Sequence, residues 1–535
     1  MDKSKLKRFA TTMRLELIQQ VSAKLEFLLK LDIENVDSLP VFYKSSVNHL
    51  KTIQDKTATK DAKEDFIEEI AYTWFNRLIA LRFMDVNSIT EIPVITALQE
   101  GANPAIFASA KEGNISDDLK IDKSNFYDLL DGKLKSTNAE NEAYNILFLS
   151  VCNYYATLMP FMFESIVDYT ELLLPEDLLS SNSLRAKVVD GMKEEDCTDI
   201  EVIGWLYQFY ISEKKDDVFV KLKKNIKITP SNIPAATQLF TPNWIVKYMV
   251  ENSLGKLWML NHPKSSLKEN MKYYIQEDNP SETFLKIATP QELTLIDPCC
   301  GSGHVLTYAF DLLTLIYEEE GYSKSEIPTL ILENNLFGCD IDKRAATLAN
   351  FALTMKARLY HRRFFKNPTK ANVLELQEFG SSFKGIKNYG SLLTPNEENM
   401  EEEDGIFGYT NDEFKLQIKI LSSQYSCVVT NPPYMGGKGM NKELGDFVKN
   451  KYPDSKSDLF AVFMERTLEM TKQNGFMSMI NQHSWMFLSS YEKLRIKIIK
   501  NHKIDTMVHL GPRAFEEIGG EVVQSVAFVL EKGEK

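Results

Sequence analysis

The sequence predicts an α/β domain with a parallel sheet and crossover helices, preceded by a mainly helical domain. Apolar residues recur at helical spacing through residues 1–225. From residue 241 to the end at 535, short apolar runs that end in polar residues alternate with helical stretches. That alternation is typical of parallel strands joined by helices. Residues 226–240, where prolines and small polar residues gather, are interpreted as a linker.

Length and composition set the class of protein. A chain of 535 residues is too long for one ordinary domain, and 44% hydrophobic with 26% charged residues excludes disorder of the whole chain. No apolar run approaches the ~20 residues of a membrane span, so no membrane association is expected. The first residues carry charges throughout and do not form a secretory signal. Six cysteines do not make a disulfide framework, so a cytoplasmic location is expected.

The net charge of −13, taken alone, argues against a nucleic-acid partner. The charge is unevenly placed, however. Residues 394–404 hold six acidic side chains and no basic one. A global sum can therefore hide a local basic groove, and a mobile acidic loop is expected at about 394–412.

The helical domain is expected to be a core-forming bundle. Its periodic apolar positions include Leu15, Ile18, Val21, Leu25 and Leu28, and then Ile67, Ile70, Ala71, Trp74, Leu78 and Leu81. Arg77 and Arg82, close to Trp74, are expected at solvated helix positions.

The first chemical motif is LTLIDPCCGSGHVL, residues 293–306. A buried strand is expected to end at Asp297, followed by a turn with Gly301 and Gly303 and by a helix from about His304. Glycines let the backbone approach a ligand, and a helix N-terminus offers free N–H groups. A carboxylate at the strand tip suits an ammonium group or hydroxyl donors better than a pyrophosphate. A nucleotide-like ligand is favoured over a plain tight turn.

The second motif, NLFGCDIDKRAATLANFAL (335–353), ends a strand at Asp340. An acidic residue at the tip of the second strand typically accepts both ribose hydroxyls. Ile341 is placed to pack on an adenine face, and Asp342 is expected to cap the next helix. Two acidic strand tips around a glycine turn, without a phosphate cradle, favour S-adenosylmethionine over a dinucleotide.

The third motif, SCVVTNPPYMGGKG (426–439), is a strand that runs into Asn431, Pro432, Pro433 and Tyr434. Two prolines fix the backbone there. The Asn431 side chain and the Pro432 carbonyl can each accept one N–H of a planar amino group, and Tyr434 can stack on the ring that carries it. The three motifs together indicate a site that methylates an exocyclic amine.

With these motifs, residues 231–535 resemble the amino-group DNA methyltransferases, in which the cofactor motif precedes NPPY. The resemblance implies a Rossmann-like, S-adenosylmethionine-dependent domain. It implies that Thr241 and Pro242 lie near the methionine part of the cofactor. It also assigns Asp297, Cys299, Gly301 and Gly303 to the cofactor loop, Asp340 and Ile341 to ribose and adenine, and the tetrapeptide 431–434 to catalysis. The acid expected after the third strand is left open between Glu375 and Glu378.

The N-terminal half resembles the PglX family of adenine-specific methyltransferases of BREX phage defence, through MDKSKLKRFATTMRLELIQQV and YTWFNRLIALRFMD. This resemblance implies methylation of adenine N6 in double-stranded DNA, with partner proteins of a defence complex. PglX proteins are expected to be much longer, so the target-recognition region is expected to be absent from this chain or supplied by another. The chain is then a fragment or split form, or it works like the modification subunit of a type I restriction system.

Other functions remain as alternatives. Methylation of a protein glutamine is open because a carboxamide is also planar, and a non-catalytic scaffold is open as well. Cytosine C5 methylation is disfavoured because Tyr434 stands where a thiolate would be needed. A zinc site at Cys299, Cys300, His304 and Cys339 is disfavoured because adjacent cysteines rarely bind one ion, so no metal is expected. Lys438, Lys442 and His483 are candidate substrate contacts.

Overall fold

The computed structural model describes residues 2–36, 46–99, 101–163, 169–277, 283–395, 412–512, 514–515 and 524–533. The chain divides into two compact units, Met1–Tyr210 and Ile211–Lys535. The division comes earlier than the end of the helical domain that the sequence predicts at residue 225. Helix α11 (Ser212–Lys223) therefore falls in the second unit.

The first unit is helical, and its described residues contain no strand, only one isolated bridge between Ala97 and Pro104. Its helices are α1 (Lys3–Leu28), α3 (Val47–Lys56), α4 (Lys60–Val86), α5 (Ala105–Lys111), α6 (Lys123–Leu130), α7 (Ala139–Leu158), α8 (Pro160–Phe163), η2 (Glu171–Leu173), α9 (Leu184–Gly191), η3 (Glu194–Thr198) and α10 (Glu201–Tyr210).

Helix α1 buries a stripe that differs slightly from the predicted one. Leu17, Val21, Leu25 and Leu28 are buried at helical spacing, whereas Leu15 is 53% exposed. Residues three or four apart share a helix face. Leu17 lies four residues before Val21 and belongs to the buried face, whereas Leu15 lies six residues before Val21 and does not. The predicted apolar positions of α4, by contrast, are all buried.

Arg77 and Arg82 of α4 are buried, so the expectation of solvated positions was wrong. Arg77 donates to the backbone carbonyl of Phe163 at 3.1 Å, and Arg82 donates to that of Met192 at 2.9 Å. A guanidinium carries five donors in a fixed fork, so it can satisfy carbonyls at the ends of neighbouring segments. These side chains stabilise the interior of the bundle.

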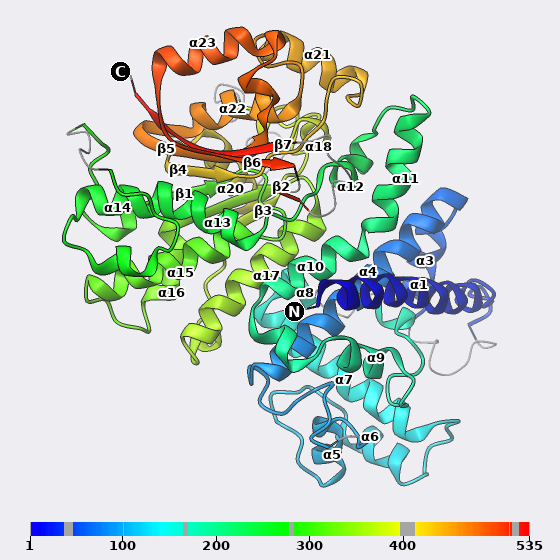
Figure 1. Cartoon of the computed structure of the whole chain (residues 1–535). Helices are drawn as coiled ribbons and strands as arrows, with labels where there is room; N and C mark the ends of the chain where they lie inside the picture. The colour runs from blue at the N-terminus through cyan, green and yellow to red at the C-terminus, as the bar shows by residue number, and fades with distance from the viewer. Residues whose placement is uncertain are drawn as a thin grey trace. The chain divides into compact units, whose positions relative to one another are not determined.

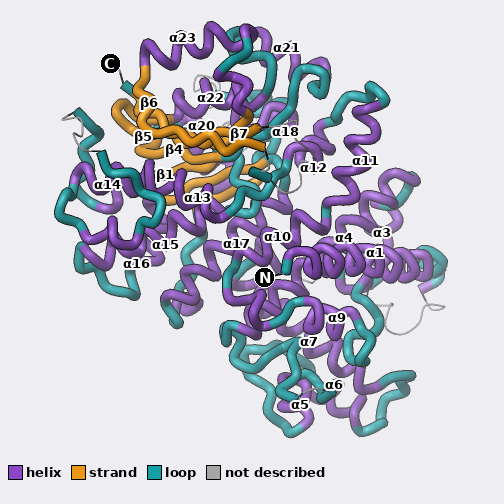
Figure 2. The backbone as a smooth tube through the Cα atoms, in the orientation of Figure 1, coloured by secondary structure: helices purple, strands orange, loops and turns teal. Residues whose placement is uncertain are grey.

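The second unit contains a seven-stranded sheet in the order β3-β2-β1-β4-β5-β7-β6 (Figures 1 and 2). The strands are β1 (Leu295–Asp297), β2 (Leu336–Asp340), β3 (Asn372–Glu375), β4 (Tyr425–Thr430), β5 (Thr471–Gln482), β6 (His502–Pro512) and β7 (Gln524–Lys532). Strands β1 to β5 are parallel. Strand β7 pairs antiparallel with both β5 and β6.

Helices cover both faces of this sheet, as Figure 1 shows with α15, α16 and α17 on one side and α21, α22 and α23 on the other. The helices of the unit, in chain order after α11, are α12 (Ile233–Thr237), α13 (Asn243–Val250), α14 (Lys256–Asn261), α15 (His304–Glu319), α16 (Ile327–Leu330), α17 (Lys343–Tyr360), α18 (Ile386–Tyr389), α20 (Asp412–Ser422), α21 (Lys442–Lys451), α22 (Leu459–Met470) and α23 (Glu492–Asn501).

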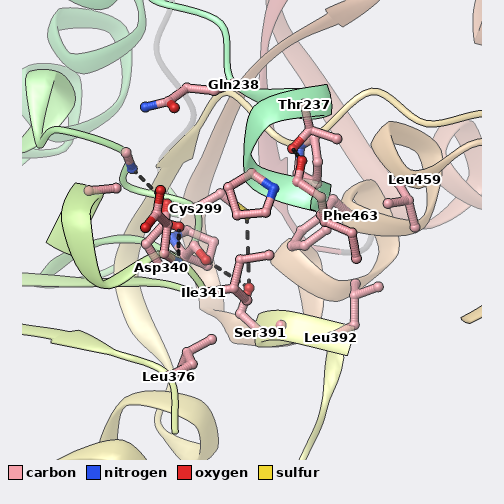
Figure 3. Close-up of a pocket in the computed structure, with 18 of the residues that line it drawn as sticks. Thr237, Gln238, Cys299, Asp340, Ile341, Leu376, Ser391, Leu392, Leu459 and Phe463 are labelled. Atoms are coloured by element: carbon pink, nitrogen blue, oxygen red, sulfur yellow. Dashed lines mark hydrogen bonds between the residues drawn. The ribbon is translucent and has the colours of Figure 1, made fainter. Parts of the chain in front are cut away.

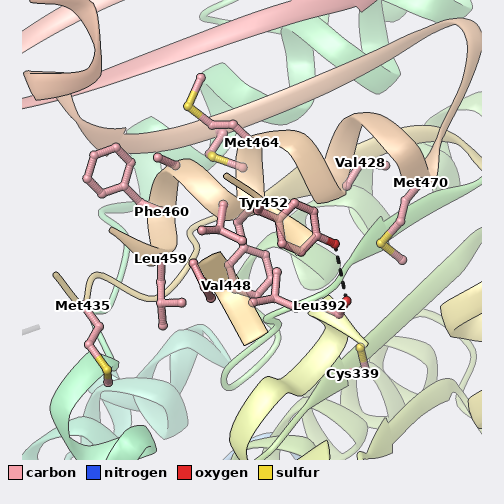
Figure 4. Packing of buried hydrophobic residues seen from close by; sticks show 14 of the residues in the cluster. Cys339, Leu392, Val428, Met435, Val448, Tyr452, Leu459, Phe460, Met464 and Met470 are labelled. Carbon is pink, nitrogen blue, oxygen red and sulfur yellow. Dashed lines mark hydrogen bonds between the residues drawn. The ribbon is translucent and has the colours of Figure 1, made fainter. Parts of the chain in front are cut away.

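Alternate residues of the strands enter two separate cores. In β4, Cys427 and Val429 pack with helices α13 to α17, whereas Val428 packs with α20 to α23. Figure 4 shows the second core, where Tyr452 lies among Val448, Leu392 and the methionines of α22 and its hydroxyl donates to the Leu392 carbonyl. A sheet buried on both faces is the doubly wound arrangement, so the predicted Rossmann-like α/β fold is confirmed.

The predicted linker is not plain coil. It contains the 3₁₀ turn η4 (Pro230–Asn232) and helix α12, and Ile233 and Ala235 are buried in the second core. Residues 396–411 of the expected acidic loop lie outside the described residues. Among the helices that the structure describes, none is both long and apolar enough to cross a bilayer.

Candidate active site

The carboxyl ends of β1, β2 and β4 meet at one edge of the sheet. Asp297 pairs in register with Gly338, and Ile296 pairs with Val428, so the tips that follow these strands lie side by side. Strands β1 and β4 are neighbours although β2 and β3 lie between them in the sequence, which makes this edge the point where strand order reverses. Ligands of doubly wound folds bind outside such a point.

A pocket opens at this edge and holds about 770 Å³ of space, part of it open to solvent. That volume falls in the range of ~300–1,000 Å³ that is typical of small-molecule sites. Six of the predicted site residues line it, namely Cys299, Gly301, Asp340, Ile341, Asn431 and Pro433. The site therefore joins the three sequence motifs, which are separated by more than a hundred residues from first to last.

Figure 3 shows how the walls are built. Cys299, Asp340 and Ile341 lie on one side, and Leu459 and Phe463 of α22 lie on the other. One side thus carries polar groups and the other is apolar.

The glycine turn after β1 has left-handed backbone conformations at Gly301 (φ 52°) and Gly303 (φ 83°). A Cβ atom at Gly303 would lie 2.9 Å from the backbone Cα of Ala349 in α17, so only glycine lets the two segments approach. The Gly301 N–H donates to Asp340 Oδ2 at 3.0 Å. The turn is thereby fixed to the tip of β2.

Asp340 lines the pocket and accepts a backbone hydrogen bond at each oxygen. Oδ2 accepts from Gly301 and Oδ1 accepts from the Asp342 N–H at 2.9 Å. Burial raises the pKa of Asp340 to about 6. Each carboxylate oxygen has a second lone pair, so the ionised group can also accept two ligand hydroxyls.

We predict that the affinity for S-adenosylmethionine falls by about tenfold between pH 8 and pH 5. Hydroxyls that donate to Asp340 favour its ionised form, and with a pKa of about 6 roughly one-tenth of the carboxyl is ionised at pH 5. Protonation also removes an acceptor that holds the glycine turn. Calorimetric titrations across this range measure the effect.

The control for this prediction is Asp340→Asn, in which the part of the pH dependence that comes from this carboxyl should disappear. Asp297→Asn tests how much of the pH dependence comes from Asp297 instead, because the pKa of Asp297 lies near 7 and that of Asp340 near 6. An affinity that stays constant from pH 8 to pH 5 would contradict a contact between Asp340 and the ligand.

Asp297 is 2% exposed and is not among the residues that line the pocket. Its Oδ1 accepts from Thr430 Oγ1 at 2.7 Å and from the Cys299 N–H at 3.1 Å. Burial, and then the nearby charge of Asp340, raise the pKa of Asp297 to about 7. The carboxyl therefore ties the tip of β1 to the last residue of β4, directly before Asn431.

Asn431 lines the pocket and carries an unpaired amide oxygen. Its Nδ2 donates to the Leu239 carbonyl at 3.3 Å and to Thr241 Oγ1 at 3.1 Å. Its Oδ1 is buried, and nothing in the described part of the chain donates a hydrogen bond to it. A buried acceptor left without a donor costs about 1–3 kcal/mol, so this oxygen is suited to a ligand N–H.

The rest of the tetrapeptide is held firmly. The Tyr434 hydroxyl donates to the Ile480 carbonyl of β5 at 3.1 Å, and burial raises the pKa of Tyr434 well above its usual range. Asp458 caps α22 and accepts from the Met435 N–H at 2.9 Å. Pro432 is buried, and neither it nor Tyr434 lines the pocket.

The remaining predicted residues lie around this centre. Thr241 and Pro242 precede α13 and do not line the pocket, although Thr241 contacts Asn431. Lys438 and Lys442 are exposed shortly after the tetrapeptide. His483 follows β5, and its Nδ1 lies 2.9 Å from Nε2 of His509.

Neither acid proposed after the third strand lines the pocket. Glu375 at the tip of β3 forms an ion pair with Lys387, whose Nζ also donates to the Ile341 carbonyl at 3.0 Å. Glu378 accepts from the Gly385 N–H at 3.1 Å. Leu376, the residue directly after β3, lines the pocket instead.

Sequence reasoning missed several lining residues. Gln238 lines the pocket with a buried Oε1 that has no donor in the described part of the chain. The segment 388–392 supplies another wall, in which the Ser391 hydroxyl donates to the Pro298 carbonyl at 2.7 Å. Leu459 and Phe463, one turn apart on α22, also line the pocket. Gln238 and the segment 388–392 belong to no periodic pattern, because they reach the pocket through the packing of their segments.

The cysteines near the turn are thiols rather than thiolates. Burial, together with the charges of Asp297 and Asp340, raises the pKa of Cys299 and of Cys300 well above the usual range. Only the thiolate is a good zinc ligand, so this environment opposes metal binding at the turn.

A family model described as Eco57I restriction-modification methylase matches residues 334–515, from the start of β2 to beyond β6. Over these residues the chain is similar to the methylases that this family model describes. Two curated relatives align with most of the chain. Adenine-specific methyltransferase BrxX of Escherichia coli O9:H4 (strain HS) is 39% identical over 89% of this chain and 45% of the relative. Adenine-specific methyltransferase PglX of Lacticaseibacillus casei (strain Zhang) is 38% identical over 99% and 51%.

The chain is therefore a homologue of the adenine-specific methyltransferases named PglX and BrxX, and the resemblance to that family is confirmed. It spans about half the length of these curated relatives.

Solved structures are more distant. The DrdV–DNA complex has a TM-score of 0.47 and 12% identity, covering 99% of this chain and 42% of that one. The restriction-modification enzyme MmeI in complex with DNA has a TM-score of 0.46 and 15% identity, covering 87% and 55%. The fold assignment rests on the sheet order and not on these scores.

Proposed function

We propose that this chain transfers a methyl group from S-adenosylmethionine to N6 of an adenine that has been flipped out of double-stranded DNA. The observation that carries the proposal is the buried, unpaired Oδ1 of Asn431 in the pocket. Two curated relatives of the chain are named adenine-specific methyltransferases, which favours adenine as the base.

The pocket fits a nucleoside-like cofactor. Asp340 offers free lone pairs to ribose hydroxyls, and Ile341 on its side and Leu459 and Phe463 on the opposite side provide apolar surface for a flat base. Gly301 has open space where a Cβ would be, so a ligand can approach its backbone closely. S-adenosylmethionine supplies an activated methyl group when it is bound.

The protein's own part is to hold and polarise the amine. The lone pair of adenine N6 is conjugated with the ring, which makes the nitrogen a poor nucleophile. Hydrogen bonds from the amine to Asn431 Oδ1 and to the Pro432 carbonyl draw it toward a tetrahedral geometry and stabilise the positive charge that develops on it. Tyr434 would stack on the flipped base, which offsets part of the cost of unstacking.

We place the chain in a BREX-like phage-defence system, acting in the cytoplasm where its DNA substrate lies. Partner proteins, or the remainder of a longer chain, would select the DNA sequence. The modification subunit of a type I-like system is the nearest alternative arrangement.

The decisive experiment combines methylome sequencing with cofactor binding. A methylation-free bacterial host would express the chain alone and together with its genomic neighbours, and single-molecule sequencing would locate the modified bases. We expect N6-methyladenine in a fixed sequence context when the chain is expressed together with the neighbour that supplies target recognition. Methyl groups found on cytosine, or on protein glutamine in labelled extracts, would overturn the assignment. So would failure of the purified chain to bind S-adenosylmethionine.

A further inference from the structure

The carboxamide of Asn431 is held in one orientation by the segment before α13. Its two Nδ2 hydrogens have two acceptors, the Leu239 carbonyl and Thr241 Oγ1. Both acceptors belong to the same short segment, 190 or so residues away in the sequence. The amide oxygen is thereby turned away from this segment and stays without a donor.

Thr241 is itself mounted on a rigid element. It is 6% exposed and precedes Pro242, whose ring fixes the backbone. The Pro242 carbonyl accepts from the N–H groups of Ile245 and Val246, so it starts α13. Both of those residues are fully buried in the core against the sheet. The hydroxyl of Thr241 is therefore placed by the packing of α13 and not by a flexible loop.

We infer that Thr241 is a positioning residue for the methyl transfer, and that it acts by fixing the carboxamide of Asn431 with Oδ1 toward the substrate amine. The inference rests on the proposed function. A carboxamide turned by 180° would present N–H groups to another N–H donor and could accept nothing. The Leu239 carbonyl can only accept, so it disfavours a turned oxygen that would face it, and Thr241 Oγ1 adds a second acceptor for Nδ2 in the observed orientation.

This role differs from the one that the family resemblance implies, in which Thr241 lies near the methionine part of the cofactor. The two roles separate in kinetics. A cofactor contact raises the dissociation constant of S-adenosylmethionine, whereas a positioning contact lowers the rate of transfer at saturating cofactor. Thr241 does not line the pocket, which favours the second role.

The test compares Thr241→Val, which keeps the shape and removes the acceptor, with Thr241→Ser, which keeps the acceptor. Thr229→Val, at an exposed position outside the pocket, is the matched control. For Thr241→Val we expect single-turnover transfer to slow by roughly ten- to hundredfold and the cofactor dissociation constant to stay within about twofold. Thr241→Ser should restore most of the rate. Unchanged transfer in Thr241→Val, or a loss confined to cofactor binding, would overturn the inference.

A double-mutant cycle and a crystal structure complete the test. In an Asn431→Ala background, Thr241→Val should slow transfer no further, because the group that it positions is gone. If Thr241→Val instead acted through a general loss of stability, it would slow transfer further in the Asn431→Ala background as well. A crystal structure of Thr241→Val at atomic resolution, where amide nitrogen and oxygen can be told apart, should show the Asn431 carboxamide rotated or in two orientations, and an unchanged carboxamide there would refute the inference. If wild-type protein transfers no methyl group to DNA, the proposed function fails, whereas the crystal structure still decides the role of Thr241.

Discussion

Replacing Asn431 with alanine is expected to slow methyl transfer by about a hundred- to thousandfold while cofactor affinity stays within about twofold. The substitution removes the buried, unpaired acceptor of a residue that lines the pocket, and the proposed function places this acceptor against the substrate amine. Acceptors that act mainly in the transition state affect the rate of the chemical step more than ground-state binding. Single-turnover transfer of a labelled methyl group, with calorimetry of the cofactor, measures both quantities.

Asn450→Ala is the matched control, because Asn450 lies exposed on α21. It should behave as wild type in both measurements. Wild-type transfer in Asn431→Ala would contradict the catalytic role of the tetrapeptide. If cofactor affinity fell as much as the rate of transfer, Asn431 would be a cofactor contact and not a contact of the substrate amine.

Replacing Lys256 with methionine is expected to destabilise the second unit by about 3–5 kcal/mol. Lys256 of α14 is 2% exposed, and its Nζ lies 2.6 Å from Asp505 Oδ1 in β6, whose side chain is fully buried. Methionine keeps the packing of the stem but removes the nearer cation of a buried carboxylate, which then keeps only Lys503, with its Nζ 3.6 Å from Oδ1. The shift of the thermal midpoint of this unit in calorimetry measures the effect.

The size of this destabilisation should depend on pH, in a direction that follows from the pKa of Asp505. Burial raises the pKa of Asp505, and Lys256 acts against that rise. Without Lys256 the folded-state pKa lies further above the unfolded value, so the folded state binds a proton more readily. The loss of stability should therefore be largest at pH 8 and shrink as the pH falls.

The double substitution Lys256→Met with Asp505→Leu should recover much of the stability, because no unpaired charge remains. Lys264→Met, at an exposed position, is the surface control and should change the midpoint little. A full effect from the surface control, or none from Lys256→Met, would contradict the account of a buried ion pair.

Local patterns in the sequence were sufficient to predict which residues stand at the ends of the strands. Asp297, Asp340 and Asn431 each follow a short apolar run, and each run is a strand of the sheet. The glycine turn could be predicted because left-handed backbone conformations, which Gly301 and Gly303 both adopt, favour glycine. Parallel strands end at one edge, so strand identity alone brings these residues together.

Burial of polar side chains could not be predicted in this way. Arg77 and Arg82 were expected in solvent because charged residues usually lie there, yet each finds backbone carbonyls inside the bundle. Asp297 was expected to touch a ligand, and it lies beneath the turn, bonded to Thr430. Whether a polar group faces solvent, a ligand or the interior depends on partners far away in the sequence.

The amino-acid sequence by itself determined the class of this protein, since strand, glycine turn and NPPY each carry their chemistry within a few consecutive residues. The tertiary structure decided which segments line the pocket and how the Asn431 amide is oriented. Gln238, Thr241 and Phe463 come from separate segments, and their places follow from the packing of helices against the sheet. Packing is a property of the whole fold, so no local pattern of residues can encode it alone.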